Sequence, residues 1–147
     1  MKKLSLLLVF TAFLMSCDKD NTADCDGLVC DETFKMLTVD FVNKDGIGVA
    51  ISNYSAINLR TNDTVYSKLS ATANTIPGTF IVLDDEYRPK LSAKGDDIKV
   101  TGTYDADKQT KSTIIKVANP VCGCHFEKIS GEQTVKFDLS IPKKSLH

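Results

Sequence analysis

Apolar and polar residues alternate along most of this chain with a period of two. The apolar Leu37, Val39 and Phe41 are separated by the polar Thr38 and Asp40. Such alternation is typical of a β-strand with one buried face, whereas an amphipathic helix repeats every ~3.6 residues. Short runs that could form strands lie at residues 34–42, 47–51, 56–60, 64–67, 80–83, 98–104, 113–117 and 134–139. The pattern predicts about eight short strands and no amphipathic helix.

Turn-forming sequences separate these runs. Asn43-Lys44-Asp45-Gly46, Pro77-Gly78 and Lys94-Gly95-Asp96 combine residues that favour tight turns. Many short strands joined by such turns indicate two packed antiparallel sheets. We therefore predict an all-β fold, an antiparallel β-sandwich of about seven to eight strands with an immunoglobulin-like or transthyretin-like architecture.

The first residues follow a different pattern. Lys2 and Lys3 precede an apolar run at residues 4–15, and the small Ser16 follows it. These are the three parts of a secretory signal peptide. The run is shorter than the ~20 apolar residues that a membrane-spanning helix needs, and no later segment is long or apolar enough to predict one.

The block Leu14-Met15-Ser16-Cys17 resembles the lipobox of bacterial lipoproteins. The resemblance implies that residues 1–16 are removed as a signal peptide and that Cys17 carries the lipid, including palmitate. Several acyl chains hold a protein durably on a membrane, whereas one chain does not. Under the alternative, an ordinary secretory signal peptide, Cys17 is a spare thiol.

The next residues bear on location. Asp18-Lys19-Asp20 resembles the surface-export signal of Bacteroidota lipoproteins, which implies the outer membrane, with surface display. In enterobacteria an aspartate at the position of Asp18 would instead favour the inner membrane. Polar residues predict a lipidated tether at 17–31, which includes Cys25 and Cys30, and we assign residues 32–147 to the sandwich.

Four cysteines remain when Cys17 is assigned to the lipid. An even number outside the cytoplasm suggests disulfides, and four thiols allow three pairings. A bond between Cys122 and Cys124 would close a strained ring, so we favour two long bridges from Cys25 and Cys30 to this pair. The alternative pairs Cys25 with Cys30 and Cys122 with Cys124.

Other chemistry for these cysteines is less favoured. Structural zinc sites pair cysteines two to four residues apart, and the one-residue spacing in Cys122-Gly123-Cys124-His125 falls outside that range. A c-type haem needs two residues between its cysteines. Thiol redox catalysis needs a Cys-x-x-Cys at the start of a helix, which is also missing. We predict no cofactor and no metal ligands.

Charge and histidine content exclude further classes. Without residues 1–16 the chain has 16 basic and 19 acidic residues, a formal charge of −3, and no cluster of cations that nucleic acid would need. His125 and His147 are the only histidines, and no nucleophile motif accompanies either. We therefore predict no catalytic residues and expect His125 to be a partly exposed packing residue. The acidic run at residues 84–86 is expected to solvate a turn.

The block at residues 122–131 resembles a late Cys-Gly-Cys-His cluster in small envelope lipoproteins of Bacteroidota. That group has no established activity, so the resemblance implies an envelope location and a β-fold. Our leading hypothesis is a non-enzymatic, membrane-anchored accessory or adhesion-like module that binds an envelope or extracellular protein.

The rival hypothesis is a surface module that binds a glycan or a metal ion. Glycan sites use aromatic platforms, but Trp is absent and Tyr54, Tyr66, Tyr87 and Tyr104 are scattered along the sequence. Calcium would need oxygen-rich loops such as Asp105-Ala106-Asp107. Asp63-Thr64-Val65 resembles an O-glycosylation site of Bacteroidota, which implies that Thr64 is exposed.

Overall fold

The computed structural model describes residues 25–69 and 76–138. The predicted signal peptide, Cys17 and His147 lie outside the described residues. The elements are β1 (Met36–Val42), β2 (Ile51–Asn58), β3 (Thr79–Asp84), the 3-10 helix η1 (Arg88–Lys90), β4 (Asp96–Tyr104), β5 (Thr110–Ala118), β6 (Glu127–Ser130) and β7 (Thr134–Lys136).

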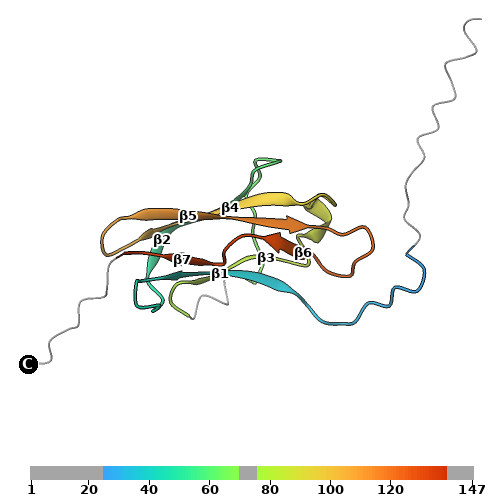
Figure 1. Cartoon of the computed structure of the whole chain (residues 1–147), viewed down its shortest axis with the longest axis horizontal. Coiled ribbons are helices and arrows are strands. Elements are labelled where there is room, and N and C mark those ends of the chain that lie inside the picture. The colour runs from blue at the N-terminus through green and yellow to red at the C-terminus, as the bar shows by residue number, and fades with distance from the viewer. Residues whose placement is uncertain (1–24, 70–75, 139–147) are drawn as a thin grey trace, which may run out of the picture.

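The strands form two sheets that pack face to face (Figure 1). The first sheet has the order β3-β1-β7, and the second has the order β2-β4-β5-β6. All pairs are antiparallel except β1 and β7, which run parallel. The prediction of an all-β fold with about seven strands is confirmed. The described residues contain no α-helix.

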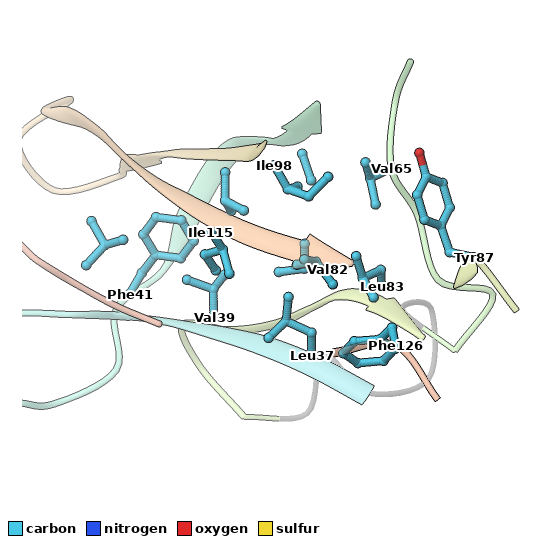
Figure 2. Close-up of a cluster of buried hydrophobic side chains, with 14 of the residues drawn as sticks. Leu37, Val39, Phe41, Val65, Val82, Leu83, Tyr87, Ile98, Ile115 and Phe126 are labelled. Atoms are coloured by element: carbon cyan, nitrogen blue, oxygen red, sulfur yellow. The ribbon is translucent and has the colours of Figure 1, made fainter. Parts of the chain in front are cut away.

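Burial follows the alternation in the sequence. In β4, Ile98 and Val100 are fully buried, whereas Asp97 and Lys99, which alternate with them, are exposed. Side chains from both sheets meet in one apolar core (Figure 2). Phe41, Phe126 and Phe137 are its largest fully buried members. The period of two in the sequence therefore selects which face of each sheet lies inside.

Three features of the strand pattern were predicted wrongly. The run at residues 64–67 forms no strand, and only an isolated bridge joins Thr64 to Ile57. Residues 47–51 and 56–60 were expected to be separate strands, but the segment between them continues as β2 through an irregularity between Ser52 and Ser55. Asn53 has a φ of 51° there, a left-handed conformation that asparagine tolerates better than most residues. Strand β6 was missed because all four of its residues are exposed, so they show no alternation.

A buried carboxylate joins the edge of the second sheet to the loop before β4. Asp96 accepts hydrogen bonds from Arg60 Nε at 2.6 Å and Arg60 Nη2 at 2.8 Å. Its Oδ2 atom also accepts from Asn58 Nδ2 at 2.8 Å and from the Ser92 N–H at 3.2 Å. These bonds, with Arg60 the largest cause, hold the pKa of Asp96 below its ordinary value. The fully buried charge is thus completely paired.

None of the helices in the part of the chain that the structure describes is long and apolar enough to cross a membrane.

Candidate functional site at the cysteine end

We call residues 25–35 and 119–126 together the cysteine end. The first segment leads into β1 and the second connects β5 to β6 (Figure 1). Disulfides join Cys25 to Cys122 and Cys30 to Cys124, with Cα–Cα distances of 5.5 and 5.4 Å. These are the two long bridges favoured by the sequence. They also suggest an extracytoplasmic location, since cytoplasmic thiols are kept reduced.

The two bridges act as one unit. Their sequence separations are 97 and 94 residues, so either bridge alone would lower the entropy of the unfolded chain by an amount worth ~4.7 kcal/mol. Once one bridge is present, the other closes only the small ring formed by residues 25–30 and 122–124. The chain-entropy model gives ~2–3 kcal/mol for such a ring.

The last strand that the sequence predicts is the run at residues 134–139, so bridges to Cys122 and Cys124 would attach the first segment near the start of that strand, and the structure corrects this expectation. The bridged cysteines precede β6, and the last described strand, β7, begins only at Thr134. The error follows from the missed strand β6. The bridges therefore fix the first segment to the end of the four-stranded sheet, because β6 pairs with β5.

An ionic array reinforces the cysteine end. His125 Nδ1 lies 2.7 Å from Asp85 Oδ2, and His125 Nε2 lies 3.2 Å from Asp31 Oδ1. Asp31 belongs to the N-terminal segment, Asp85 follows β3, and His125 precedes β6. The array therefore joins three segments that are far apart in the sequence.

The array favours the charged imidazolium. A carboxylate accepts hydrogen bonds and donates none, so each ring nitrogen must carry a proton to satisfy both acids. Asp85, and then Asp31, raise the pKa of His125 above its ordinary value of 6.5. The sequence predicts that His125 is a partly exposed packing residue. The side chain is indeed 25% exposed, but its two carboxylate partners were missed.

Asp85 is held by more than the histidine. Its Oδ2 atom accepts from the Lys35 N–H at 2.7 Å, and its Oδ1 atom accepts from the Phe126 N–H at 3.3 Å. Partial burial acts to raise the pKa of Asp85, but these bonds and the bond from His125 outweigh it and lower the pKa. Lys35 Nζ in turn donates to the Phe126 carbonyl at 3.0 Å. Asp85 is thus a fixed anion at the junction.

A hydroxyl beside the histidine raises the question of catalysis. Thr33 Oγ1 lies 3.4 Å from His125 Nε2, so Asp85, His125 and Thr33 are in the order of a nucleophilic triad. The Thr33 hydroxyl, however, donates to Asp31 Oδ1 at 2.6 Å. A histidine with acids on both sides keeps its proton and cannot take one from the hydroxyl. The arrangement is suited to holding segments together.

The same geometry bears on metal binding. Asp31 and Asp85 lie against opposite nitrogens of the His125 ring, so their oxygens do not converge on one point. The cysteine sulfurs are bonded in pairs, whereas zinc is held by free thiolates. Over residues 25–69 and 76–138, no group of three His, Cys, Asp or Glu side chains is placed to hold a metal ion.

The acidic run at residues 84–86 was expected to solvate a turn, and this was wrong. Asp84 is buried and accepts a hydrogen bond from the Ser67 hydroxyl. Asp85 belongs to the histidine array, and Glu86 Oε2 pairs with Lys68 Nζ at 2.8 Å. Successive side chains at the end of a strand point in different directions, so each of the three acids meets a different partner. Only the tertiary structure supplies those partners.

The acidic loop considered for calcium is a turn closed by its own side chains. Asp107 Oδ1 accepts from the Gln109 N–H at 2.9 Å, and Asp105 Oδ1 lies 3.6 Å from Lys108 Nζ. Thr64, of the possible glycosylation site, is exposed and forms an isolated bridge with Ile57 of the edge strand β2. Its position therefore agrees with the exposure that the resemblance to a glycosylation site implies.

The cysteine end also carries exposed apolar side chains. Val29 is 89% exposed, Val121 is 64% exposed and Leu28 is 49% exposed. Val29 lies next to Cys30, Val121 lies next to Cys122, and Cys25 Sγ is 3.6 Å from the Val121 carbonyl oxygen. The bridges thus hold these three side chains, which we call the apolar tip, at one end of the domain.

Comparisons with known proteins give no relative: no protein-family model matches the chain, and neither a curated protein nor a solved structure matches it.

Proposed function

We propose that this chain is a non-enzymatic lipoprotein of the bacterial cell envelope, anchored through lipid on Cys17, and that its sandwich binds an envelope or extracellular protein. The observation that carries the proposal is the doubly bridged segment directly after the lipobox-like block. Cys25 and Cys30 lie 8 and 13 residues beyond Cys17. A pull on the lipid would therefore be transmitted to the folded domain by covalent bonds.

The tether limits how far the domain reaches. Eight residues span at most ~29 Å when fully extended. An anchor at Cys17 therefore keeps Cys25 within about that distance of the lipid headgroups. The short reach favours a module that acts on neighbours at the membrane over one that samples a large volume.

The partner surface we propose is the apolar tip. Apolar side chains that are exposed together on one surface mark a contact with another protein. Loss of two bridges would release Leu28, Val29 and Val121 into flexible segments, so the disulfides order the tip before binding. An ordered surface binds with a smaller loss of conformational entropy.

We also propose a location for the protein and a more specific architecture for its fold. The outer membrane with surface display is favoured by Asp18-Lys19-Asp20, and an immunoglobulin-like or transthyretin-like architecture is favoured by the spacing of short strands and turns. An experimental structure compared with both architectures tests the second assignment. Protease accessibility on intact cells tests the first.

The anchor is tested by metabolic labelling of the full chain with a palmitate analogue in a bacterial host. We expect the chain to incorporate the label and to fractionate with membranes, and the Cys17→Ala variant to lose both properties. The Cys25→Ala/Cys122→Ala variant is the matched control, because it removes a cysteine pair and keeps Cys17. Equal labelling of the chain and the Cys17→Ala variant would contradict the proposal.

The partner is tested by placing a photo-crosslinking residue at Val29 in the anchored protein on its native cells. We expect a discrete crosslinked product with one envelope protein. The same residue at Lys99, which is exposed on β4, should not give that product. Equal crosslinking from both positions, or crosslinks to lipid alone, would contradict protein binding at the apolar tip.

A further inference from the structure

A small hollow lies where the segment after β2 meets the end of β3 and helix η1. Its lining residues are Tyr66, Lys68, Asp84, Glu86, Tyr87 and Lys90. The four tyrosines are scattered along the sequence, but Tyr66 and Tyr87 meet here. The volume of the cavity is about 160 Å³, which is below the ~300–1,000 Å³ of sites for drug-sized molecules. The hollow therefore suits one small ring.

The floor of the hollow is polar and fixed. Asp84 and Tyr87 are almost fully buried. Asp84 accepts hydrogen bonds from the Ser67 hydroxyl and from the Glu86 N–H, the latter at 3.0 Å. Asp85, between Asp84 and Glu86, points away to the histidine array. Both sides of this short segment are thus constrained, and the floor of the hollow is held in place by the protein itself.

Lys90 supplies a cation at the hollow. Its Nζ atom lies 5.4 Å from the centre of the Tyr66 ring and 5.3 Å from the centre of the Tyr87 ring. Among the residues that the structure describes, no carboxylate lies within ion-pair distance of this ammonium group. The rings attract its charge but leave its N–H groups able to donate to an anion.

The other lysine at the hollow differs. Lys68 Nζ already pairs with Glu86 Oε2 at 2.8 Å, and this exposed pair offers both donors and acceptors at the rim. Tyr66 is 56% exposed, so part of its ring faces solvent. The C–H bonds of a sugar ring carry partial positive charge and pack well on the negative face of an aromatic ring.

We propose that this hollow binds an acidic sugar, a uronic acid residue of a glycan. The sugar ring packs on Tyr66, its carboxylate accepts hydrogen bonds from Lys90, and its hydroxyl groups bond to the Lys68 and Glu86 pair. The site lies apart from the apolar tip in its residues and requires no lipid on Cys17. The proposal therefore stands or falls independently of the proposed function.

The test is a titration of the full chain, purified in a detergent without a sugar headgroup, and followed by two-dimensional amide NMR. The probes are methyl β-D-glucuronide, methyl β-D-glucoside and acetate. We expect the glucuronide to shift the amide signals of residues 66–68 and 84–90. The glucoside and acetate should each bind at least about tenfold more weakly, a difference of ~1.4 kcal/mol.

Two variants assign the roles. Lys90→Gln removes the cation and should bring the affinity for the glucuronide down to that for the glucoside. Tyr66→Ala should weaken both sugars and leave acetate unchanged. Lys99→Gln is the matched control, because it removes an exposed lysine of β4 and should change nothing. Amide spectra of each free variant show whether its fold is intact.

Each other outcome overturns the proposal in a defined way. Equal affinity for glucuronide and glucoside would remove the role of Lys90. Equal affinity for acetate and glucuronide would leave only an anion site. Shifts confined to residues outside the hollow, or no shifts at tens of millimolar glucuronide, would show that the hollow binds no acidic sugar.

Discussion

His125 and Asp85, which are 40 residues apart in the sequence, are joined by a hydrogen bond of 2.7 Å from the ring Nδ1 to the carboxylate Oδ2. The bond ties the loop before β6 to the end of β3, and these two strands belong to different sheets. Together with Asp31 on the other ring nitrogen, it makes the cysteine end dependent on pH as well as on the disulfides.

The pH dependence has a defined sign. A pKa of His125 raised above 6.5 means that its contribution to stability is complete below pH 6.5 and is lost as the pH rises through the raised pKa. Hydrogen bonds from Thr33, and then from His125, lower the pKa of Asp31. The pKa of Asp85 is lowered as well. Their contributions are lost in acid, so the array stabilises most between about pH 4 and pH 6.5.

Replacement of His125 by Gln should therefore lower the free energy of unfolding more at about pH 5.5 than at about pH 8.5. Denaturant unfolding with intact disulfides measures the difference. His147→Gln is the matched control, because it removes the other imidazole of the chain. An identical loss of stability at both pH values would mean that the histidine acts only by packing.

The disulfides should show strong non-additivity. Loss of either bridge alone, by Cys→Ala at both of its ends, should lower the free energy of unfolding by ~2–3 kcal/mol, because the remaining bridge still closes the long loop. Loss of both should cost ~7 kcal/mol, more than twice the effect of one. Denaturant unfolding of the three variants checks this. Two single losses that add up to the double loss would exclude a shared loop.

Asp96 and Asp97 are neighbours with opposite surroundings. Asp96 is buried and accepts four hydrogen bonds, whereas Asp97 is exposed on β4. Asp96→Ala should destabilise the fold by ~3–5 kcal/mol, since it leaves buried donors without partners. Asp97→Ala should change the stability by less than ~0.5 kcal/mol. If thermal or denaturant unfolding showed equal effects for the two variants, the buried pair of Arg60 and Asp96 would not stabilise the fold as expected.

Gly102 lets β4 approach the core closely. A Cβ atom at this position would lie 2.8 Å from Phe41 Cε1 and 2.8 Å from Ile51 Cγ2. Gly102→Ala should therefore destabilise the protein by ~1–3 kcal/mol through overpacking. Its neighbour Thr101, on the other face of β4, is the control, and Thr101→Ala should have a smaller effect. A neutral Gly102→Ala would show that the Phe41 ring can move aside.

The sequence by itself determined the all-β class and most of the strands, and it favoured two long bridges between the two pairs of cysteines, but only the structure decided that Cys25 bonds Cys122 and Cys30 bonds Cys124. Alternation in runs such as Leu37, Val39 and Phe41 reports which side chains are buried, because a strand turns successive side chains to opposite faces. The pairing of cysteines could be ranked because Cys122 and Cys124 are too close to bridge each other without strain. The burial of side chains in a strand and the distance between Cys122 and Cys124 both depend on neighbouring residues, so they can be predicted from the sequence.

Only the tertiary structure decided the role of His125, the position of β6 and the hollow at Lys90. Strand β6 is short and exposed, so it has no burial pattern and forms by pairing with β5. The partners of His125 lie 40 and 94 residues away, and Tyr66 and Tyr87 meet across two segments. Contacts between residues that are far apart in the sequence depend on how the two sheets pack. The spacing of residues along the chain does not show which of them come close together.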